Sequence, residues 1–257
     1  MSRELVNEER LVAFLSDKVT RRVGHYFENL VHYYLVHHAD YSDIRHSLQI
    51  RDGNRTIGEL DFVYRDADAR HVHLETAVKF YLYVAGQRVI GSHYIGPNAR
   101  DTLERKTQRL HQHQLPLSDL EMARIRIGAG ALEPITKSNW VRGMIFYRPG
   151  EPVSTGASSI LAPGHPRGVW IRESELDWFG RQPASHTYRV LRKPFWLSAR
   201  GDDVDSAAAN QDHVVEQLQR HFRIEKHPVM IGCFSTSLSS EVCRLMVVGD
   251  SWPETID

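Results

Sequence analysis

Apolar residues recur at three- and four-residue steps between Glu8 and Ala39, which is the spacing of amphipathic helices. They fall into two groups, Leu11–Leu15 and Val23–Leu35, so we predict two consecutive helices. The second of them would place Gly24 and Glu28 one turn apart.

Three apolar segments of strand length follow, separated by turn sequences, at Ile44–Arg51, Gly58–Tyr64 and Val72–Val84. A polar helix is predicted at Asp101–His113, and a fourth strand at Trp140–Tyr147. The order helix, three strands, helix, strand predicts a mixed α/β core.

The composition changes after Pro149, where Pro, Gly and Ser become frequent and aromatic residues return. Beyond it we predict one helix and two strands, at Asn210–Phe222, Val229–Phe234 and Val242–Val248. The expected organisation is therefore a core over residues 1–150 and an α+β extension over residues 151–257 that packs on the core.

Acidic residues interrupt the second and third predicted strands. Because alternate side chains of a strand share a face, Glu59 and Asp61 face one way on the second strand. Glu75 and Lys79 share a face of the third.

Burial of a carboxylate is costly unless its charge is paired or binds a metal. Mg²⁺ or Mn²⁺ would suit Asp61 and Glu75, since Mg²⁺ usually takes one or two protein carboxylates together with substrate phosphates. Phosphodiester hydrolysis is the chemistry that such a site supports.

Each of these residues also has a structural interpretation. Asp61 and Glu75 are alternatively the acidic partners of Arg55 or Arg70 at the end of a sheet. Lys79 is alternatively paired with Glu75.

Glu28 has two readings as well. It is either a third acid that reaches the waters of a bound metal, or a helix-surface residue paired with Arg21 or Arg22. Glu59 is more typical of a solvated residue at the entry of a strand.

Lys plus Arg total 32 and Asp plus Glu total 32, so the chain has no general attraction for nucleic acid and any phosphate-binding surface must be local. The candidate nucleic-acid-binding residues lie on or beside the helix after the acidic strands: Arg100, Arg105, Lys106 and Arg109. Asp101 and Glu104 interleave with them, so a solvated face of mixed charge is the alternative.

The remaining chemistry is less specific. His71 and His73 share the strand face of Glu75 and are the histidines that could join the site. Cys233 and Cys243 show no CxxC spacing, which fits a reducing compartment. The acidic N-terminus lacks the pattern of a signal peptide, so we expect a cytoplasmic protein without a membrane partner. The sequence leaves a homodimer open.

The arrangement of Glu28 on a helix, Asp61 in GELDF and Glu75 with Lys79 in HLETAVKF resembles the PD-(D/E)XK nuclease-like superfamily, which includes restriction enzymes and Holliday-junction resolvases. Over nearly its whole length the chain is also similar to a bacterial family described as domain of unknown function 1853. The segments that carry this similarity include RVGHYFENLVHYYL, GELDFVYRD, GPNARDTLERK, HQLPLS, HPRGVWIR and CRLMVVGDSWP.

The resemblance implies a restriction-endonuclease-like core of order αβββαβ, with a mixed sheet flanked by helices, and a Mg²⁺- or Mn²⁺-dependent nuclease that acts on DNA rather than RNA. By position, it assigns catalytic roles to Glu28, Asp61, Glu75 and Lys79, and metal ligation to Asp61 and Glu75. The sequence departs from the pattern at one point, because Ala77 stands where the lysine is usual. Lys79 lies about 6–7 Å farther along the strand. The alternative function is a catalytically degenerate nuclease fold that binds nucleic acid or protein.

Overall fold

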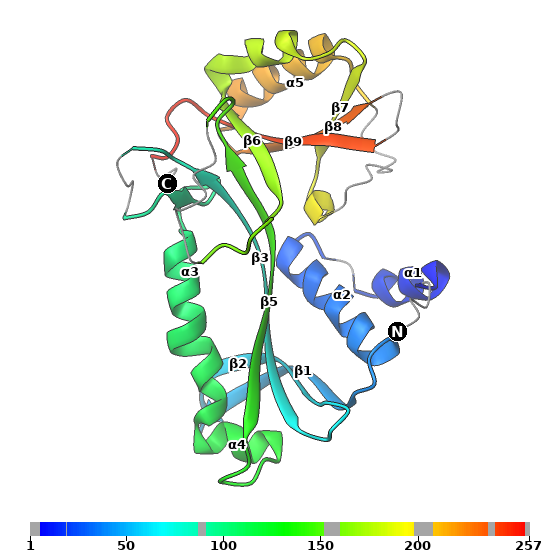
Figure 1. Cartoon of the computed structure of the whole chain (residues 1–257), viewed down its shortest axis with the longest axis vertical. Helices are drawn as coiled ribbons and strands as arrows, with labels where there is room; N and C mark the ends of the chain where they lie inside the picture. Colours follow the sequence, from blue (N-terminus) through cyan, green and yellow to red (C-terminus); the bar gives the residue numbers. More distant parts are fainter. Residues whose placement is uncertain are drawn as a thin grey trace. The chain divides into compact units, whose positions relative to one another are not determined.

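The computed structural model describes residues 6–18, 20–86, 91–151, 160–197, 208–235 and 240–254. It is an α/β protein with a large mixed sheet flanked by helices (Figure 1). The strands follow the order β1-β2-β3-β5-β6-β9-β8-β7, and the short β4 pairs with β3. Within the described ranges, no helix is long and apolar enough to cross a membrane.

The chain divides into two compact units. The first comprises residues 1–78 and 107–142, and the second comprises residues 79–106 and 143–257. Strands β3 and β5 contribute residues to both units. The sequence-based division at residue 150 stays a prediction, because it describes a boundary along the chain rather than these units.

The first unit is built from the N-terminal helices, the β1–β2 hairpin and the helical segment after the third strand. Its elements are α1 (Glu8–Ser16), α2 (Val23–His37), β1 (Ser42–Asp52), β2 (Arg55–Arg65), the start of β3 (His71–Tyr83), the end of α3 (Leu103–Arg109), the π-helical η1 (Leu110–Gln114), the 3₁₀ helix η2 (Leu115–Asp119), α4 (Glu121–Ile127) and the start of β5 (Ile135–Tyr147). Helix α2 presents Val31 and Leu35, one turn apart, and they pack in one cluster with Phe62 and Leu74. The face of α2 that carries these two residues therefore packs on the apolar residues of β2 and β3.

The second unit holds the C-terminal half of the sheet. Its further elements are β4 (Tyr94–Ile95), β6 (Arg167–Arg172), η3 (Glu173–Arg181), β7 (His186–Leu191), η4 (Phe195–Leu197), α5 (Gln211–Ile224), β8 (Val229–Ser235) and β9 (Ser240–Val248). Strand β6 runs parallel to β5 and β9, whereas β7, β8 and β9 are antiparallel neighbours. Helix α5 covers this part of the sheet (Figure 1), with Val214, Leu218 and Phe222 in the core that includes Ile231 and Leu245.

The predicted helices and strands of the first 150 residues are found in the predicted order, as are the helix and two strands predicted near the C-terminus. The sequence pattern missed β4 and α4, which lie between the predicted elements of the core, and also β6 and β7. Strands β6 and β7 have six residues each, and polar residues interrupt their apolar positions, so the alternation is too short to stand out.

Gly143 in β5 allows the backbones of β5 and β3 to lie unusually close together. Its φ is +145°, and a Cβ built there would overlap the backbone carbonyl oxygen of Lys79. We predict that Gly143→Ala lowers the free energy of unfolding by about 2–4 kcal/mol, because backbone atoms cannot move aside cheaply. Urea denaturation followed by circular dichroism measures this. Gly180→Ala is the control, since no heavy atom lies within 4 Å of its added carbon. Equal stability of the two variants would contradict the prediction.

Candidate functional site

Asp61 and Glu75 lie where side chains replace the backbone ladder between β2 and β3. The ladder runs as far as the pair Phe62 and Leu74. Just beyond this pair, the Thr76 N–H donates to Asp61 Oδ2 at 2.7 Å and the Thr76 hydroxyl donates to the same oxygen at 3.0 Å. The Asp61 N–H in turn faces Glu75 Oε1 at 3.4 Å. Each carboxylate thus satisfies a backbone N–H of the opposite strand, and this holds the two acids together.

Glu75 is fixed from several directions. Its residue is only 1% exposed. Oε1 accepts from His73 Nε2 at 2.9 Å as well as from the Asp61 N–H, and Oε2 accepts from Gln114 Nε2 at 2.5 Å. A carboxylate offers about four lone-pair positions, so these three donors leave one position on Oε2. The second nitrogen of His73 lies 3.1 Å from Ser118 Oγ, which fixes the imidazole.

The pKa of the Asp61 carboxyl is raised at this site. Burial, followed by the neighbouring charge of Glu75, raises its pKa from 3.8 to about 7, and the more distant Glu28 adds to the shift. The hydrogen bonds from Thr76 oppose this rise in pKa. Among the described residues, no hydrogen bond reaches Oδ1 of Asp61, so this oxygen is available to a ligand.

Glu28 on α2 belongs to the same acidic group. Burial raises its pKa, and the negative charges of Glu59 and Glu75 raise it further, while His25 lowers it. The predicted alternative of a pair with Arg21 or Arg22 is not found in the described part of the chain.

The nearest basic group to Glu28 is instead His46, whose Nε2 lies 4.0 Å from a Glu28 oxygen. Burial and Lys18 lower the pKa of His46 below its ordinary value, so this imidazole is mostly neutral at pH 7. It therefore does little to neutralise Glu28.

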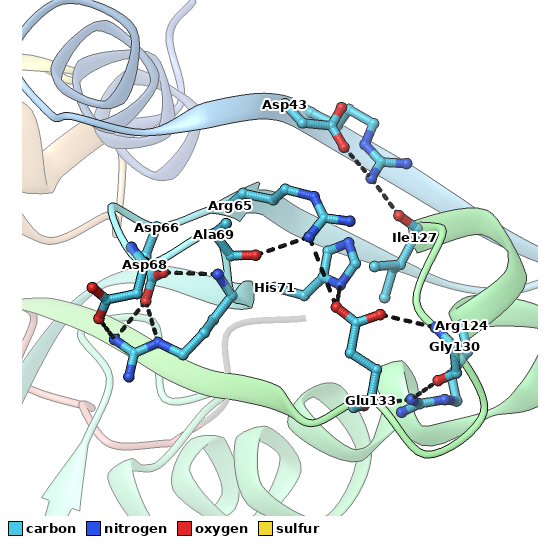
Figure 2. Close-up of polar contacts among 12 residues, drawn as sticks. Asp43, Arg65, Asp66, Asp68, Ala69, His71, Arg124, Ile127, Gly130 and Glu133 are labelled. Atoms are coloured by element: carbon cyan, nitrogen blue, oxygen red, sulfur yellow. Dashed lines mark hydrogen bonds and ion pairs between the residues drawn. The ribbon is translucent and has the colours of Figure 1, made fainter.

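Among the described residues, neither Arg55 nor Arg70 forms an ion pair with Asp61 or Glu75. Arg70 forms ion pairs with Asp66 at 2.8 Å and Asp68 at 2.7 Å, inside the β2–β3 turn. Figure 2 shows this turn beside a second group, in which His71 Nδ1 lies 2.7 Å from Glu133. His71 therefore faces Glu133. Of the two histidines proposed for the site, His73 is the one that contacts an acid of the cluster.

Lys79 does not form the predicted alternative pair with Glu75. Its ammonium donates to Asp101 Oδ2 at 2.8 Å, and the Tyr81 hydroxyl lies 3.4 Å from the same oxygen. Both partners of this ion pair are about one-third exposed. Lys79 and Asp101 belong to the second compact unit and the three acids to the first, so a catalytic role for Lys79 stays a prediction.

The predicted nucleic-acid-binding residues are divided between the units. Arg100, Arg105 and Lys106 lie in the second unit and Arg109 lies in the first. The Arg105 guanidinium donates to the Arg100 carbonyl at 2.8 Å, at the start of α3. Their contact with nucleic acid stays a prediction.

Sequence reasoning missed a basic groove in the first unit, which we call the β1 groove. It has a volume of about 620 Å³, and its described lining contains no acid: Arg45, His46, Ser47, Leu48, Gln49, Arg51 and Arg126. The Arg45 guanidinium donates to the carbonyls of Arg126 at 2.7 Å and Ile127 at 2.6 Å, at the C-terminal end of α4, and it also pairs with Asp43 at 2.9 Å. The alternation of Arg45 and Arg51 with apolar residues along β1 hinted at this surface, but α4 completes it from 75 residues away or more.

Metal-binding capacity can be judged from the donors alone. In the ranges that the structure describes, no group of three or more His, Cys, Asp or Glu side chains is placed to enclose a metal ion. A Mg²⁺ site does not require such a group, because the ion keeps several waters and takes one or two carboxylates. Asp61 Oδ1 and the remaining position on Glu75 Oε2 match that smaller requirement.

The raised pKa of Asp61 predicts an unusual dependence of stability on pH. Between pH 3.8 and about 7 the unfolded chain has lost this proton while the folded protein keeps it, so stability must fall as the pH rises. Asp61→Asn keeps an oxygen for Thr76 and removes the charge. In chelator at pH 8 it should raise the free energy of unfolding by on the order of 2–4 kcal/mol, and at pH 4 it should change little.

Urea denaturation at the two pH values measures this difference. Asp40→Asn, at an exposed position, is the control and should be neutral at both. An Asp61→Asn protein that is less stable than wild type at pH 8 would show that the charge is well accommodated.

Comparison with known proteins gives one relationship. The model of a family described as Domain of unknown function (DUF1853) matches residues 4–248. Neither the curated proteins nor the solved structures gave a match. Since the matched region covers nearly the whole chain, the protein belongs to the DUF1853 family.

Proposed function

We propose that this protein is a Mg²⁺- or Mn²⁺-dependent nuclease with a PD-(D/E)XK-like core, and that it hydrolyses phosphodiester bonds of DNA. The observation that carries the proposal is the pair Asp61 and Glu75, which is held at the junction of β2 and β3 with Asp61 left without a basic partner in the described structure. Two carboxylates kept together in this way repel each other, and either a proton on Asp61, as its raised pKa reflects, or a bound cation relieves that repulsion.

The side chains around the pair support this assignment. Thr76 orients Asp61, and Gln114 and His73 orient Glu75. Such outer hydrogen bonds fix ligand carboxylates in metal sites. A divalent cation bound there would supply Lewis acidity toward a phosphoryl oxygen and lower the pKa of a bound water. Glu28 would hold waters of that site by hydrogen bonds.

Lys79 is proposed to orient the attacking water. Its ion pair with Asp101 is partly exposed, and pairs of this kind contribute about 0–1 kcal/mol. The ammonium can therefore leave Asp101 at low cost when a phosphate is bound. The displacement of the lysine from the usual position, which Ala77 occupies, makes this step the one that most needs testing.

Substrate phosphates require basic contacts. The β1 groove offers Arg45, Arg51 and Arg126 in the same compact unit as the acids. We propose that the groove receives the DNA backbone. The contact of Arg100, Arg105, Lys106 and Arg109 with DNA is proposed from the sequence alone.

A second candidate function is a binding protein that retains the nuclease fold without catalysis. The observation that favours it is the Lys79–Asp101 ion pair, which engages the one lysine of the sequence motif. In that case the acids would bind a cation, and the β1 groove would bind nucleic acid, without cleavage.

Cleavage of labelled linear, branched and single-stranded DNA in Mg²⁺, Mn²⁺ or chelator tests the nuclease. We expect cation-dependent cutting that falls at least about 100-fold in Asp61→Asn and in Glu75→Gln, since each removes a ligand charge. Asp40→Asn should cut like wild type. Absence of cutting by the folded wild-type protein on all three substrates would reject the nuclease in favour of the binding protein.

A pair of variants decides the role of Lys79. If Lys79 acts in catalysis, Lys79→Ala should slow cutting by about 100-fold, whereas Asp101→Asn should leave the rate unchanged or higher because it releases the ammonium. If the ion pair is only structural, the two variants should be impaired alike. Rates under single-turnover conditions, with melting temperatures measured beside them, distinguish the two results.

A further inference from the structure

A cavity of the second unit lies between α5, the end of β7 and the start of β8. Its volume is about 870 Å³, within the range of small-molecule sites. We call it the α5 pocket. All of its described lining residues belong to the second unit.

The inner wall of the α5 pocket is apolar. Leu191, Leu218, Met230 and Trp196 line it, and each of them is largely buried. Trp196 is 8% exposed, and its indole N–H donates to the Leu191 carbonyl at 2.8 Å, which fixes the plane of the ring. The Lys193 ammonium and the Phe80 ring also contact this indole, so the wall is preformed and only a small part of the Trp196 ring faces the pocket.

The rim of the pocket is basic. Arg192 and Lys193 follow the last residue of β7, and both are exposed. The Lys193 ammonium lies 4.6 Å from the centroid of the Trp196 ring, and no hydrogen bond or ion pair to the Arg192 guanidinium is found within the described residues. Arg192 thus offers its N–H groups to a ligand.

Helix α5 contributes the opposite rim. His213, Gln217 and His221 recur at four-residue steps and so form one polar stripe that faces the pocket. His213 Nε2 lies 3.1 Å from Gln217 Nε2, and His221 Nε2 lies 2.8 Å from the His227 carbonyl oxygen. These contacts hold the side chains in place along the helix.

The lining that the structure describes contains no Asp or Glu. The Lys and Arg residues of this described lining are Arg192 and Lys193. Arginine favours phosphate through paired N–H···O bonds, and an aromatic ring favours the flat face of a base. An anion without an apolar part would leave the wall unused.

We infer that the α5 pocket binds a nucleoside phosphate, with the phosphate at Arg192 and Lys193 and the base against the wall formed by Trp196. The ligand is either a free nucleotide or one nucleotide of a single strand. The inference shares no residue with the acidic cluster and does not depend on the nuclease proposal.

Isothermal titration calorimetry of the full chain in chelator tests the inference, with AMP, adenosine, inorganic phosphate and a short single-stranded oligonucleotide as ligands. AMP or the oligonucleotide should bind at least 10-fold more tightly than adenosine or phosphate alone. Tighter binding of the oligonucleotide would identify a strand as the ligand, and tighter binding of AMP would identify a free nucleotide.

Matched variants locate the site. Arg192→Gln and Lys193→Gln should each weaken binding at least 10-fold. Arg220→Gln makes the same charge change on α5, at a residue that pairs with Glu216 and does not line the pocket, and it should bind like wild type. The inference is overturned if wild type binds none of the four ligands, or if the Arg192 and Lys193 variants bind as tightly as Arg220→Gln.

Discussion

The repulsion between two carboxylates that share a mostly buried place is the constraint on which the first unit depends. Asp61 and Glu75 are held close by backbone N–H groups of facing strands, where a continuous ladder would have used backbone carbonyls instead. That exchange keeps the donors satisfied and concentrates negative charge at one point. The rise in the pKa of Asp61 is the measure of what the arrangement costs in the absence of a cation.

The surrounding elements are arranged to maintain this pair. The π-helical η1 brings Gln114 to Glu75, and η2 brings Ser118 to the imidazole that also contacts Glu75. Helix α2 adds a third acid, Glu28, while its apolar side packs on the strands. The donors of Thr76 and Gln114 orient the carboxylates without bringing a charge of their own. The proposal of a bound cation rests on this arrangement.

The sequence predicted those features that depend on local periodicity. The two helices, the three strands and the positions of Asp61 and Glu75 on them follow from alternation and apolar spacing. The match of the family model confirms the resemblance to the DUF1853 family. The ion pairs of Arg70 could also have been predicted from the sequence, since Asp66 and Asp68 lie in the same turn.

Contacts between distant segments could not be predicted in this way. Lys79 meets Asp101 after 22 residues, and Gln114 reaches Glu75 after 39. The α5 pocket combines a helical stripe, which the sequence shows, with a basic segment after β7, a strand that the pattern missed. Such pairings depend on tertiary packing, which alternation along one segment does not encode.

The position of a bound cation tests the central claim most directly. Crystals grown above pH 7 and soaked in saturating Mn²⁺ would be measured at a wavelength where manganese scatters anomalously. The account predicts an anomalous difference peak within bonding distance of Asp61 Oδ1 and Glu75 Oε2. A map without a peak at these carboxylates, in a crystal where both side chains are well ordered, would contradict it.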